Sequence, residues 1–285
     1  MIRILITGAD SYIGKSFENW LLKENAKYFI HTIDMKNEEW ENYSFSSYDV
    51  VFHVAGIAHV PSNNKLDDLY YKVNRDLTIK TAKKAKSDGV RQFIFMSSII
   101  VYGDSGLGIK TIDVSTLANP SNAYGKSKLQ AEEGIKLLED VSFKIVILRP
   151  PMIYGKGSKG NYPKLANAAR HLPIFPDIYN QRSMLHIDNL CEFIKLVIDN
   201  IESGIFFPQN AEYVCTSEMV EFIAEIHGKK IKLIKIFNRL IKFMGRYIGS
   251  INKMFGNLVY EKSMSDYKIN YRIRNFRETI ELTER

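Results

Sequence analysis

Tyr124 and Lys128 carry the clearest chemical potential in this sequence, within Tyr124-Gly125-Lys126-Ser127-Lys128. Residues four apart lie on one face of a helix, so an ammonium group would stand beside a phenol. A neighbouring cation stabilises the phenolate and lowers the phenol pKa from its reference value of about 10. The pair is then a proton donor and acceptor usable near neutral pH. An isolated pair is more often a solvated helix face, but among 16 tyrosines only Tyr124 has lysine at this spacing.

Ser98 is a second candidate, because it directly follows the apolar segment Gln92–Ser97. If that segment is a strand of a parallel sheet, Ser98 lies at the carboxyl edge, where open α/β sheets bind ligands. There its hydroxyl would hydrogen-bond a substrate oxygen beside Tyr124. The alternative is a residue that only caps the strand end.

A glycine-containing turn, Thr7–Gly14, follows the first apolar segment and precedes an amphipathic stretch. Gly8 and Gly14 occupy the outer positions of a Gly-x-x-Gly-x-x-Gly pattern, and Ser11 replaces the middle glycine. Such a turn lets a pyrophosphate approach the backbone at a helix N-terminus. A strand-to-helix turn also needs glycine for steric reasons alone. The turn predicts a dinucleotide site that includes Tyr12 and Ile13.

Asp34 lies at the end of the second apolar segment, the next one after the turn that closes at Gly14. A carboxylate there accepts hydrogen bonds from the adenosine ribose and disfavours a 2′-phosphate. Lys36 would instead pair with that phosphate. The choice between NAD and NADP therefore stays open, as does the reading of Asp34 as a simple turn residue.

These residues need elements that position them, and the chain supplies strand-length apolar segments separated by amphipathic stretches. Strand, helix and strand in repeated order predict an α/β fold with a Rossmann-type doubly wound parallel sheet. The rhythm breaks after Pro150, which predicts a dinucleotide-binding domain at 1–150 and a smaller, mainly substrate-binding lobe at 151–285, with the chain free to cross between them. The expected strands are Ile2–Ile6, Tyr28–Ile33, Val50–Val54, Gln92–Ser97 and Phe143–Leu148, and the expected helices are Ser11–Lys27, Leu66–Ser87 and Asn122–Glu139.

The charge distribution is uneven in this chain of 285 residues with net charge +7. The segment 229–285 holds 14 basic and 5 acidic side chains, so the segment 1–228 is near neutral. A pI near 9.1 suggests a nucleic-acid partner. Because the basic excess is confined to the C-terminal fifth, only that part of the chain is a candidate for such binding. Cys191 and Cys215 cannot form a disulfide framework, and no Cys/His cluster has metal-ligand spacing. Without a signal peptide or a membrane-length apolar run, we expect a cytoplasmic protein.

Taken together, the motifs resemble the extended short-chain dehydrogenase/reductase family, which holds nucleotide-sugar epimerases, dehydratases and reductases. The resemblance covers most of the chain and departs at Ser11 and at Gly56, where the family usually has alanine. The motifs that carry it are Thr7–Gly14, Asp49-Val50-Val51-Phe52-His53-Val54-Ala55-Gly56, Asn74, Ser98 with Val101-Tyr102-Gly103, Tyr124-x-x-x-Lys128 and Leu148-Arg149-Pro150.

This resemblance implies roles. Tyr124 would be the catalytic acid/base, Lys128 would lower its pKa and bind the nicotinamide ribose, and Ser98 would hold the reacting oxygen. The cofactor would be NAD or NADP (NADH or NADPH), and the family commonly forms homodimers. The implied cofactor-binding residues are Gly8, Ser11, Tyr12, Ile13, Gly14, Asp34, Lys36, Val54, Ala55, Gly56, Asn74, Tyr124, Lys128 and Pro150.

The resemblance implies a UDP-sugar as the substrate. It does not imply a nucleic-acid partner. Arg182 matches the family arginine that contacts the diphosphate, and Asn161 matches the segment on the uridine side. His59 would line the sugar pocket, or is an ordinary loop histidine. The 4,6-dehydratases carry Asp-Glu after the position of Ser98, whereas this chain has Ile99-Ile100, which cannot transfer protons.

Dehydration is therefore disfavoured, and three functions stay open. Segments around Arg149, Arg182 and Phe255–Tyr260 look like bacterial capsule and exopolysaccharide reductases of UDP-4-keto-6-deoxy-N-acetylhexosamines. Such an enzyme would form UDP-N-acetylquinovosamine or UDP-N-acetylfucosamine. A UDP-hexose 4-epimerase with tightly bound NAD is the alternative. A non-catalytic dinucleotide sensor comes third, because Tyr124 and Lys128 are both present.

The segment between Ile236 and Phe255 has apolar residues at helical spacing, with lysine and arginine largely off that stripe. We expect an amphipathic helix that packs on the domain and leaves a solvated basic face. The alternative is contact with an anionic membrane surface.

Overall fold

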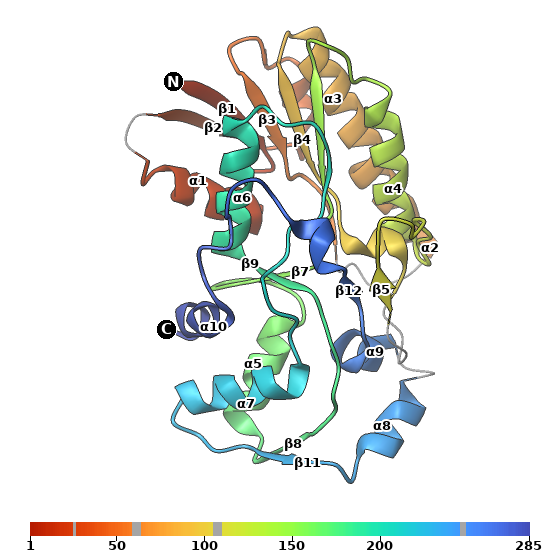
Figure 1. The fold of residues 1–285 in the computed structure, drawn as a ribbon. Coiled ribbons are helices and arrows are strands. Elements are labelled where there is room, and N and C mark those ends of the chain that lie inside the picture. Colours follow the sequence, from red (N-terminus) through yellow and green to blue (C-terminus); the bar gives the residue numbers. More distant parts are fainter. Residues whose placement is uncertain (25–26, 59–63, 105–109, 246–248) are drawn as a thin grey trace. The chain divides into compact units, whose positions relative to one another are not determined.

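The computed structural model describes residues 1–24, 27–58, 64–104, 110–245 and 249–285 (Figure 1). The chain divides into two compact units, the first formed by 1–103, 118–150 and 190–208 and the second by 104–117, 151–189 and 209–285. It thus passes five times from one unit to the other. One crossing coincides with the boundary at 150 expected from the sequence.

A six-stranded parallel sheet in the order β10-β6-β4-β3-β1-β2 forms the centre of the first unit. Helices lie on both sides, α1 and α6 on one and α3 and α4 on the other (Figure 1). The predicted doubly wound fold is confirmed. The strands are β1 Ile2–Thr7, β2 Tyr28–Ile33, β3 Val50–His53, β4 Gln92–Met96, β6 Lys144–Leu148 and β10 Gly204–Phe206. The helices are α1 Tyr12–Leu21, η1 Glu38–Glu41, α2 Asn64–Tyr70, η2 Tyr71–Asp76, α3 Leu77–Ser87, η3 Ile99–Tyr102, α4 Ala123–Lys136 and α6 Ile187–Asp199, which enters this unit at Leu190.

The central strands are apolar at successive positions because both faces of the sheet are covered. Phe93 and Phe95 point to one face and belong to the same buried cluster as Ala82 of α3 and Ala131 of α4. On the other face, Phe17 of α1 packs edge-on against the Phe52 ring, 5.3 Å between centroids. The prediction that these segments are strands without alternation of apolar and polar residues is thus confirmed.

Three features differ from the sequence expectation. The helix expected over Ser11–Lys27 ends at Leu21. The sixth strand, β10, has three residues, too few for a periodic pattern. The stretch expected as one helix over Leu66–Ser87 is interrupted by the π-helical turn η2. Such turns concentrate at functional sites because they shift a side chain out of the regular register.

The second unit is built from helices and short two-stranded pairs around its own apolar cluster. Tyr154, Leu165, Met219 and Ile223 are among the buried residues of that cluster. Its elements are β5 Thr111–Ile112, β7 Met152–Tyr154, α5 Tyr162–His171, β8 Ile174–Pro176, β9 Met184–His186, α7 Thr216–Ile226, β11 Lys232–Ile234, α8 Asn238–Met244, α9 Gly249–Phe255, β12 Val259–Tyr260, η4 Lys262–Ser265 and α10 Phe276–Glu284.

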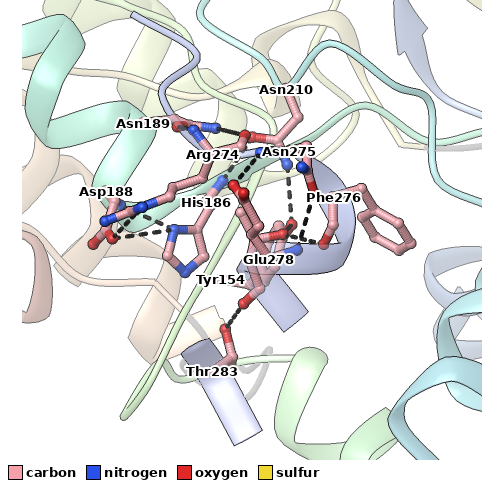
Figure 2. Close-up of polar contacts among 11 residues, drawn as sticks. Tyr154, His186, Asp188, Asn189, Asn210, Arg274, Asn275, Phe276, Glu278 and Thr283 are labelled. Atoms are coloured by element: carbon pink, nitrogen blue, oxygen red, sulfur yellow. Dashed lines mark hydrogen bonds and ion pairs between the residues drawn. The ribbon is translucent and has the colours of Figure 1, made fainter. Parts of the chain in front are cut away.

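A buried polar network ties the C-terminal part to β9 in this unit (Figure 2). The Asn210 amide donates to the Tyr154 hydroxyl at 3.0 Å, and its Oδ1 accepts from the His186 backbone at 3.0 Å. Asn189 and Arg274 exchange two bonds, at 3.0 and 3.1 Å. Burial lowers the pKa of His186 to about 4, so the imidazole is neutral at pH 7.

The segment between Ile236 and Phe255 does not form the single packed helix expected from its periodicity. It contains two short helices, α8 and α9. Ile251 and Phe255 pack on the apolar cluster, whereas Phe237 and Leu240 are exposed. The expectation that the whole stripe is buried is therefore wrong for its first part. Across the described ranges, no helix has the length and apolarity needed to cross a membrane.

Candidate active site

Tyr124 lies in the first turn of α4, at the carboxyl edge of the sheet. Asn122 begins this helix, and its Oδ1 accepts a hydrogen bond from the Gly125 backbone N–H at 2.9 Å. This cap fixes the first turn, since it satisfies a donor that the helix leaves free. The half-buried Tyr124 side chain lies near enough to Ser98 for the serine to lower the phenol pKa, and its ring lies 5.6 Å from that of Tyr70.

Ser98 follows β4 by two residues, since the strand ends at Met96, and the chain turns into η3 from Ser98. The Ser98 hydroxyl accepts from the Ile100 backbone N–H at 3.3 Å, so the serine also caps this turn. The backbone N–H of Ile99 is held by the Pro150 carbonyl at 2.9 Å. The capping role and the contact with Tyr124 thus occur together, although the sequence posed them as alternatives.

Gly125 permits the start of α4 to approach η3. Sequence reasoning did not identify this role. A Cβ at this position would lie 2.9 Å from the Ile100 carbonyl oxygen and 2.8 Å from the Pro120 Cβ. Real Cβ atoms do not come so close, so only glycine lets the start of α4 pack on η3. The identity of the residue after Tyr124 therefore controls how near Tyr124 comes to Ser98.

Lys128 is buried one turn further along α4. Its Nζ donates to the Met96 carbonyl at 2.8 Å and lies 4.7 Å from the centroid of the Phe95 ring. Burial lowers the pKa of Lys128 to about 8, and the carboxylate of Glu132 opposes that shift.

The protonation state of Tyr124 follows from its surroundings. Burial raises the pKa of Tyr124 to about 12, against the effect of the nearby Ser98 hydroxyl. Tyr124 is therefore a protonated phenol at pH 7 in this structure. In the protein alone, burial of the ring outweighs the groups that favour the phenolate, and the lowering of this pKa by Lys128 together with a cationic nicotinamide stays a prediction.

A buried ion pair behind Lys128 is the second feature that sequence reasoning missed. The Arg149 guanidinium donates from Nε to both Glu132 oxygens at 3.1 Å and from Nη2 to Oε2 at 2.5 Å. Ser97 donates a further hydrogen bond to Glu132, and the Tyr102 hydroxyl accepts from Arg149 at 2.7 Å. The spacing held a clue, because Tyr124, Lys128 and Glu132 recur every four residues on one face of α4.

The Thr7–Gly14 turn has the geometry that a dinucleotide phosphate needs. Gly8 has φ +112°, and a Cβ there would lie 2.9 Å from the Ala55 backbone nitrogen. A Cβ at Gly14 would press on the Ile6 and Val54 side chains at 3.1 Å. The turn therefore keeps the backbone bare next to the N-terminus of α1, a cradle that fits a pyrophosphate.

Ser11 has a defined place in this turn. It is the N-cap residue of α1, and its Oγ accepts from the Gly14 backbone N–H at 3.1 Å. Tyr12 and Ile13 follow as the first helical residues, both half-buried. The serine that departs from the glycine pattern thus stabilises the helix end.

Asn74 organises the segment after β3 from the π-helical turn η2. Its Oδ1 accepts from the Ile57 N–H at 2.9 Å, and its Nδ2 donates to the Ile57 carbonyl at 3.0 Å. A Cβ on Gly56 would lie 3.0 Å from Asn74 Oδ1 and 3.4 Å from Lys128 Nζ. Glycine at this position, where the family usually has alanine, thus leaves space beside both side chains. Val54 and Ala55 precede it and line the Gly8 turn.

Asp34 and Lys36 lie at the end of β2, both exposed. Asp34 Oδ1 accepts from the Lys36 backbone N–H at 3.1 Å. The Lys36 ammonium pairs with Asp10 at 2.6 Å, a carboxylate from the phosphate turn. Asp10 thus neutralises the charge of Lys36, the residue expected to favour NADP where Asp34 favours NAD.

Arg182 and Asn161 belong to the second unit. The Arg182 backbone bridges Val214 and Leu258, and its Nη1 donates to the Gly256 carbonyl at 3.1 Å. Its Nε is buried and makes no hydrogen bond within the described structure. Burial lowers the pKa of Arg182 to about 10, which leaves it charged at pH 7.

A buried cation with an unused donor fits an anionic ligand. Two motifs distant in sequence, around Arg182 and Gly256, are thus side by side. Asn161 precedes α5 without capping it through its side chain. His59 lies outside the described residues. Among the described side chains, no cluster of histidine, cysteine and carboxylates is suited to a metal ion.

Comparison with known proteins gives one family match and several relatives. Residues 4–207 match the NAD dependent epimerase/dehydratase family. The chain is 29% identical to a UDP-glucose 4-epimerase of Vibrio cholerae over 284 residues, covering 90% of this chain and 86% of that protein. It is 24% identical to the UDP-2-acetamido-2,6-beta-L-arabino-hexul-4-ose reductase of Pseudomonas aeruginosa over 248 residues, 81% of this chain and 59% of that one.

Solved structures share the fold. The UDP-glucuronic acid 4-epimerase of Bacillus cereus, in complex with NAD, superposes with a TM-score of 0.73 at 20% identity. The match covers 99% of this chain and 96% of that protein.

Proposed function

This chain belongs to the NAD dependent epimerase/dehydratase family, and we propose that it is an NAD(P)H-dependent 4-reductase of a UDP-4-keto-6-deoxy-N-acetylhexosamine. The product would be UDP-N-acetylquinovosamine or UDP-N-acetylfucosamine, according to the face of C4 that receives hydride. At the coarser level, the relatives are nucleotide-sugar 4-epimerases and reductases.

The observation that carries the proposal is a protonated Tyr124 beside Ser98. Reduction of a ketone needs a proton donor at the carbonyl oxygen, and a phenol with its pKa raised to about 12 holds that proton at pH 7. Ser98 orients the same oxygen. Ile99 and Ile100 supply no carboxylate, so the elimination step of a dehydratase has no acid or base there.

The bound nicotinamide would supply the hydride. The dinucleotide phosphates fit the Gly8–Gly14 cradle, and Lys128 would bind the nicotinamide ribose. Tyr124 then transfers its phenolic proton to the C4 oxygen, and the phenolate regains a proton from solvent. In the second unit, Arg182 would bind the substrate diphosphate and Asn161 the uridine.

The second candidate is a UDP-hexose 4-epimerase with tightly bound NAD. The observation that favours it is the Vibrio cholerae relative, whose similarity extends over 90% of this chain. In that reaction Tyr124 would first accept a proton from the 4-hydroxyl and later return it.

One experiment separates the candidates. The purified protein is incubated with a UDP-4-keto-6-deoxy-N-acetylhexosamine and NADH or NADPH, nicotinamide absorbance is followed, and NMR gives the C4 configuration. The proposal expects one nicotinamide oxidised per sugar reduced. Interconversion of UDP-glucose and UDP-galactose, with no nicotinamide oxidation by the keto sugar, would assign the epimerase instead.

The variant Tyr124→Phe tests the mechanism. It removes the transferable proton and keeps the ring, so turnover should fall by at least ~10²-fold while cofactor affinity stays close to wild type. Tyr179→Phe, at a tyrosine exposed to 74%, is the matched control and should leave turnover unchanged. Near-normal turnover in Tyr124→Phe would exclude Tyr124 as the acid.

A further inference from the structure

The segment that leads into α8 presents large apolar side chains to solvent. The α8 face consists of Ile236, Phe237, Leu240 and Phe243, exposed to 79, 41, 55 and 58%. Leu240 and Phe243, three residues apart, share one side of α8, and Ile236 and Phe237 lie in the turn directly before it. Ile241, by contrast, points to the apolar cluster of the second unit. The helix is thus anchored on one side and apolar on an outer side.

Cations dominate the charge around this face, and one of them, Lys235, pairs with Asp177 at 3.6 Å. The segment 229–260 contains eight lysines and arginines and no aspartate or glutamate. Lys235 lies directly before the face, with its side chain 81% exposed, and Arg239 lies within α8. An exposed apolar strip flanked by cations, with no acidic residue in the segment, differs from an ordinary solvated helix face, where both signs alternate.

We propose that the α8 face is an interfacial docking surface for an anionic lipid membrane. The apolar side chains would enter the boundary between headgroups and acyl chains, and the basic residues would pair with lipid phosphates. A short helix suffices, because such contacts lie in the plane of the interface and do not span the bilayer.

Charge favours this occupant over a second copy of the chain. A two-fold contact through the same face would bring two segments of eight like charges together. An anionic surface removes that repulsion, and it releases the counterions that the segment otherwise holds.

Vesicle sedimentation tests the proposal with the full chain. We expect it to pellet with sucrose-loaded vesicles of equimolar phosphatidylglycerol and phosphatidylcholine, and at least tenfold less with pure phosphatidylcholine or in 0.5 M NaCl. Ile236→Ser/Leu240→Ser and Lys235→Glu/Arg239→Glu should each lower the partition coefficient at least tenfold.

Matched controls change similar side chains elsewhere. Leu137→Ser/Val141→Ser removes exposed apolar residues of the first unit, and Lys83→Glu/Lys164→Glu reverses exposed charges on α3 and α5. Both variants should have partition coefficients within about twofold of the wild-type value, after correction for the change in net charge. Thermal melting and NAD binding establish that each variant is folded.

A labelling experiment locates the contact. Both native cysteines, Cys191 and Cys215, are buried, so a thiol-reactive fluorophore at Leu240→Cys reports that position alone. Its emission should shift to the blue with anionic vesicles, whereas the label at Leu137→Cys should not shift. Absence of pelleting with anionic vesicles would overturn the proposal. So would a concentration-dependent dimer that Ile236→Ser/Leu240→Ser dissociates in the absence of lipid.

Discussion

Replacement of Glu132 by glutamine should destabilise the first unit strongly. The carboxylate is 2% exposed and accepts three hydrogen bonds from Arg149, whose side chain is 9% exposed. The variant leaves a buried guanidinium without a counter-charge. Removal of one partner from a buried pair costs about 3–5 kcal/mol, so the free energy of unfolding should fall by that amount.

Urea unfolding measures this effect in the relevant unit. Trp20 and Trp40 are the two tryptophans of the chain and both belong to the first unit, so their fluorescence reports its unfolding alone. Glu133→Gln, at an exposed neighbour on the same helix, is the matched control and should change stability by less than ~0.5 kcal/mol. The m value should stay constant if both states keep their compactness.

A double variant distinguishes charge burial from a general packing defect. Glu132→Gln/Arg149→Met removes both charges, and it should recover more than half of the loss because an apolar pair does not require desolvation of a lone ion. A loss below ~1 kcal/mol in Glu132→Gln would refute the reasoning. A double variant no more stable than Glu132→Gln would refute it too.

Three further predictions follow from the phosphate turn and the core. Gly8→Ala, with φ +112° and a Cβ 2.9 Å from Ala55 N, should lower NAD affinity at least tenfold by calorimetry, whereas Gly89→Ala, also at positive φ but in open space, should not. Asp10→Asn frees Lys36 from its 2.6 Å ion pair and should raise the ratio of NADPH to NADH affinity several-fold; an unchanged ratio would remove Asp10 from cofactor selection. Burial lowers the pKa of His53 to about 3, so the unfolded chain takes up a proton below pH 6.5 that the folded chain does not. Unfolding free energy should thus drop by about 2 kcal/mol from pH 7 to 5 on account of this group, and His53→Gln should flatten the urea-midpoint profile.

Much of the sheet could be predicted from the sequence because buried parallel strands need apolar residues at every position. The five expected strands agree with β1, β2, β3, β4 and β6 to within one residue at each end. Family membership is confirmed as well. The strand β10 was not predicted, because its three residues are placed by pairing with β6. Such a tertiary contact leaves no pattern in the local sequence.

For the site, spacing identified Tyr124 and Lys128, and strand position identified Ser98. Their roles stay predictions, but the structure places Tyr124 and Ser98 in contact. The glycine that allows this contact, Gly125, could not be distinguished from any other helical glycine, because its requirement comes from the Ile100 carbonyl of a separate, earlier element. Long-range contacts of this kind have no local trace in the sequence.

The strand β10 has a consequence for biosynthesis. The sheet gains its outermost strand only when residues 204–206 pair with β6, after the chain has passed through 151–189 of the other unit. On the ribosome, the segment 1–150 therefore emerges with the edge of β6 open and the surface covered by α6 exposed to water. We expect nascent chains stalled before Phe206 to bind chaperones and resist compaction, and a gene fragment that stops at Pro150 to yield an insoluble product.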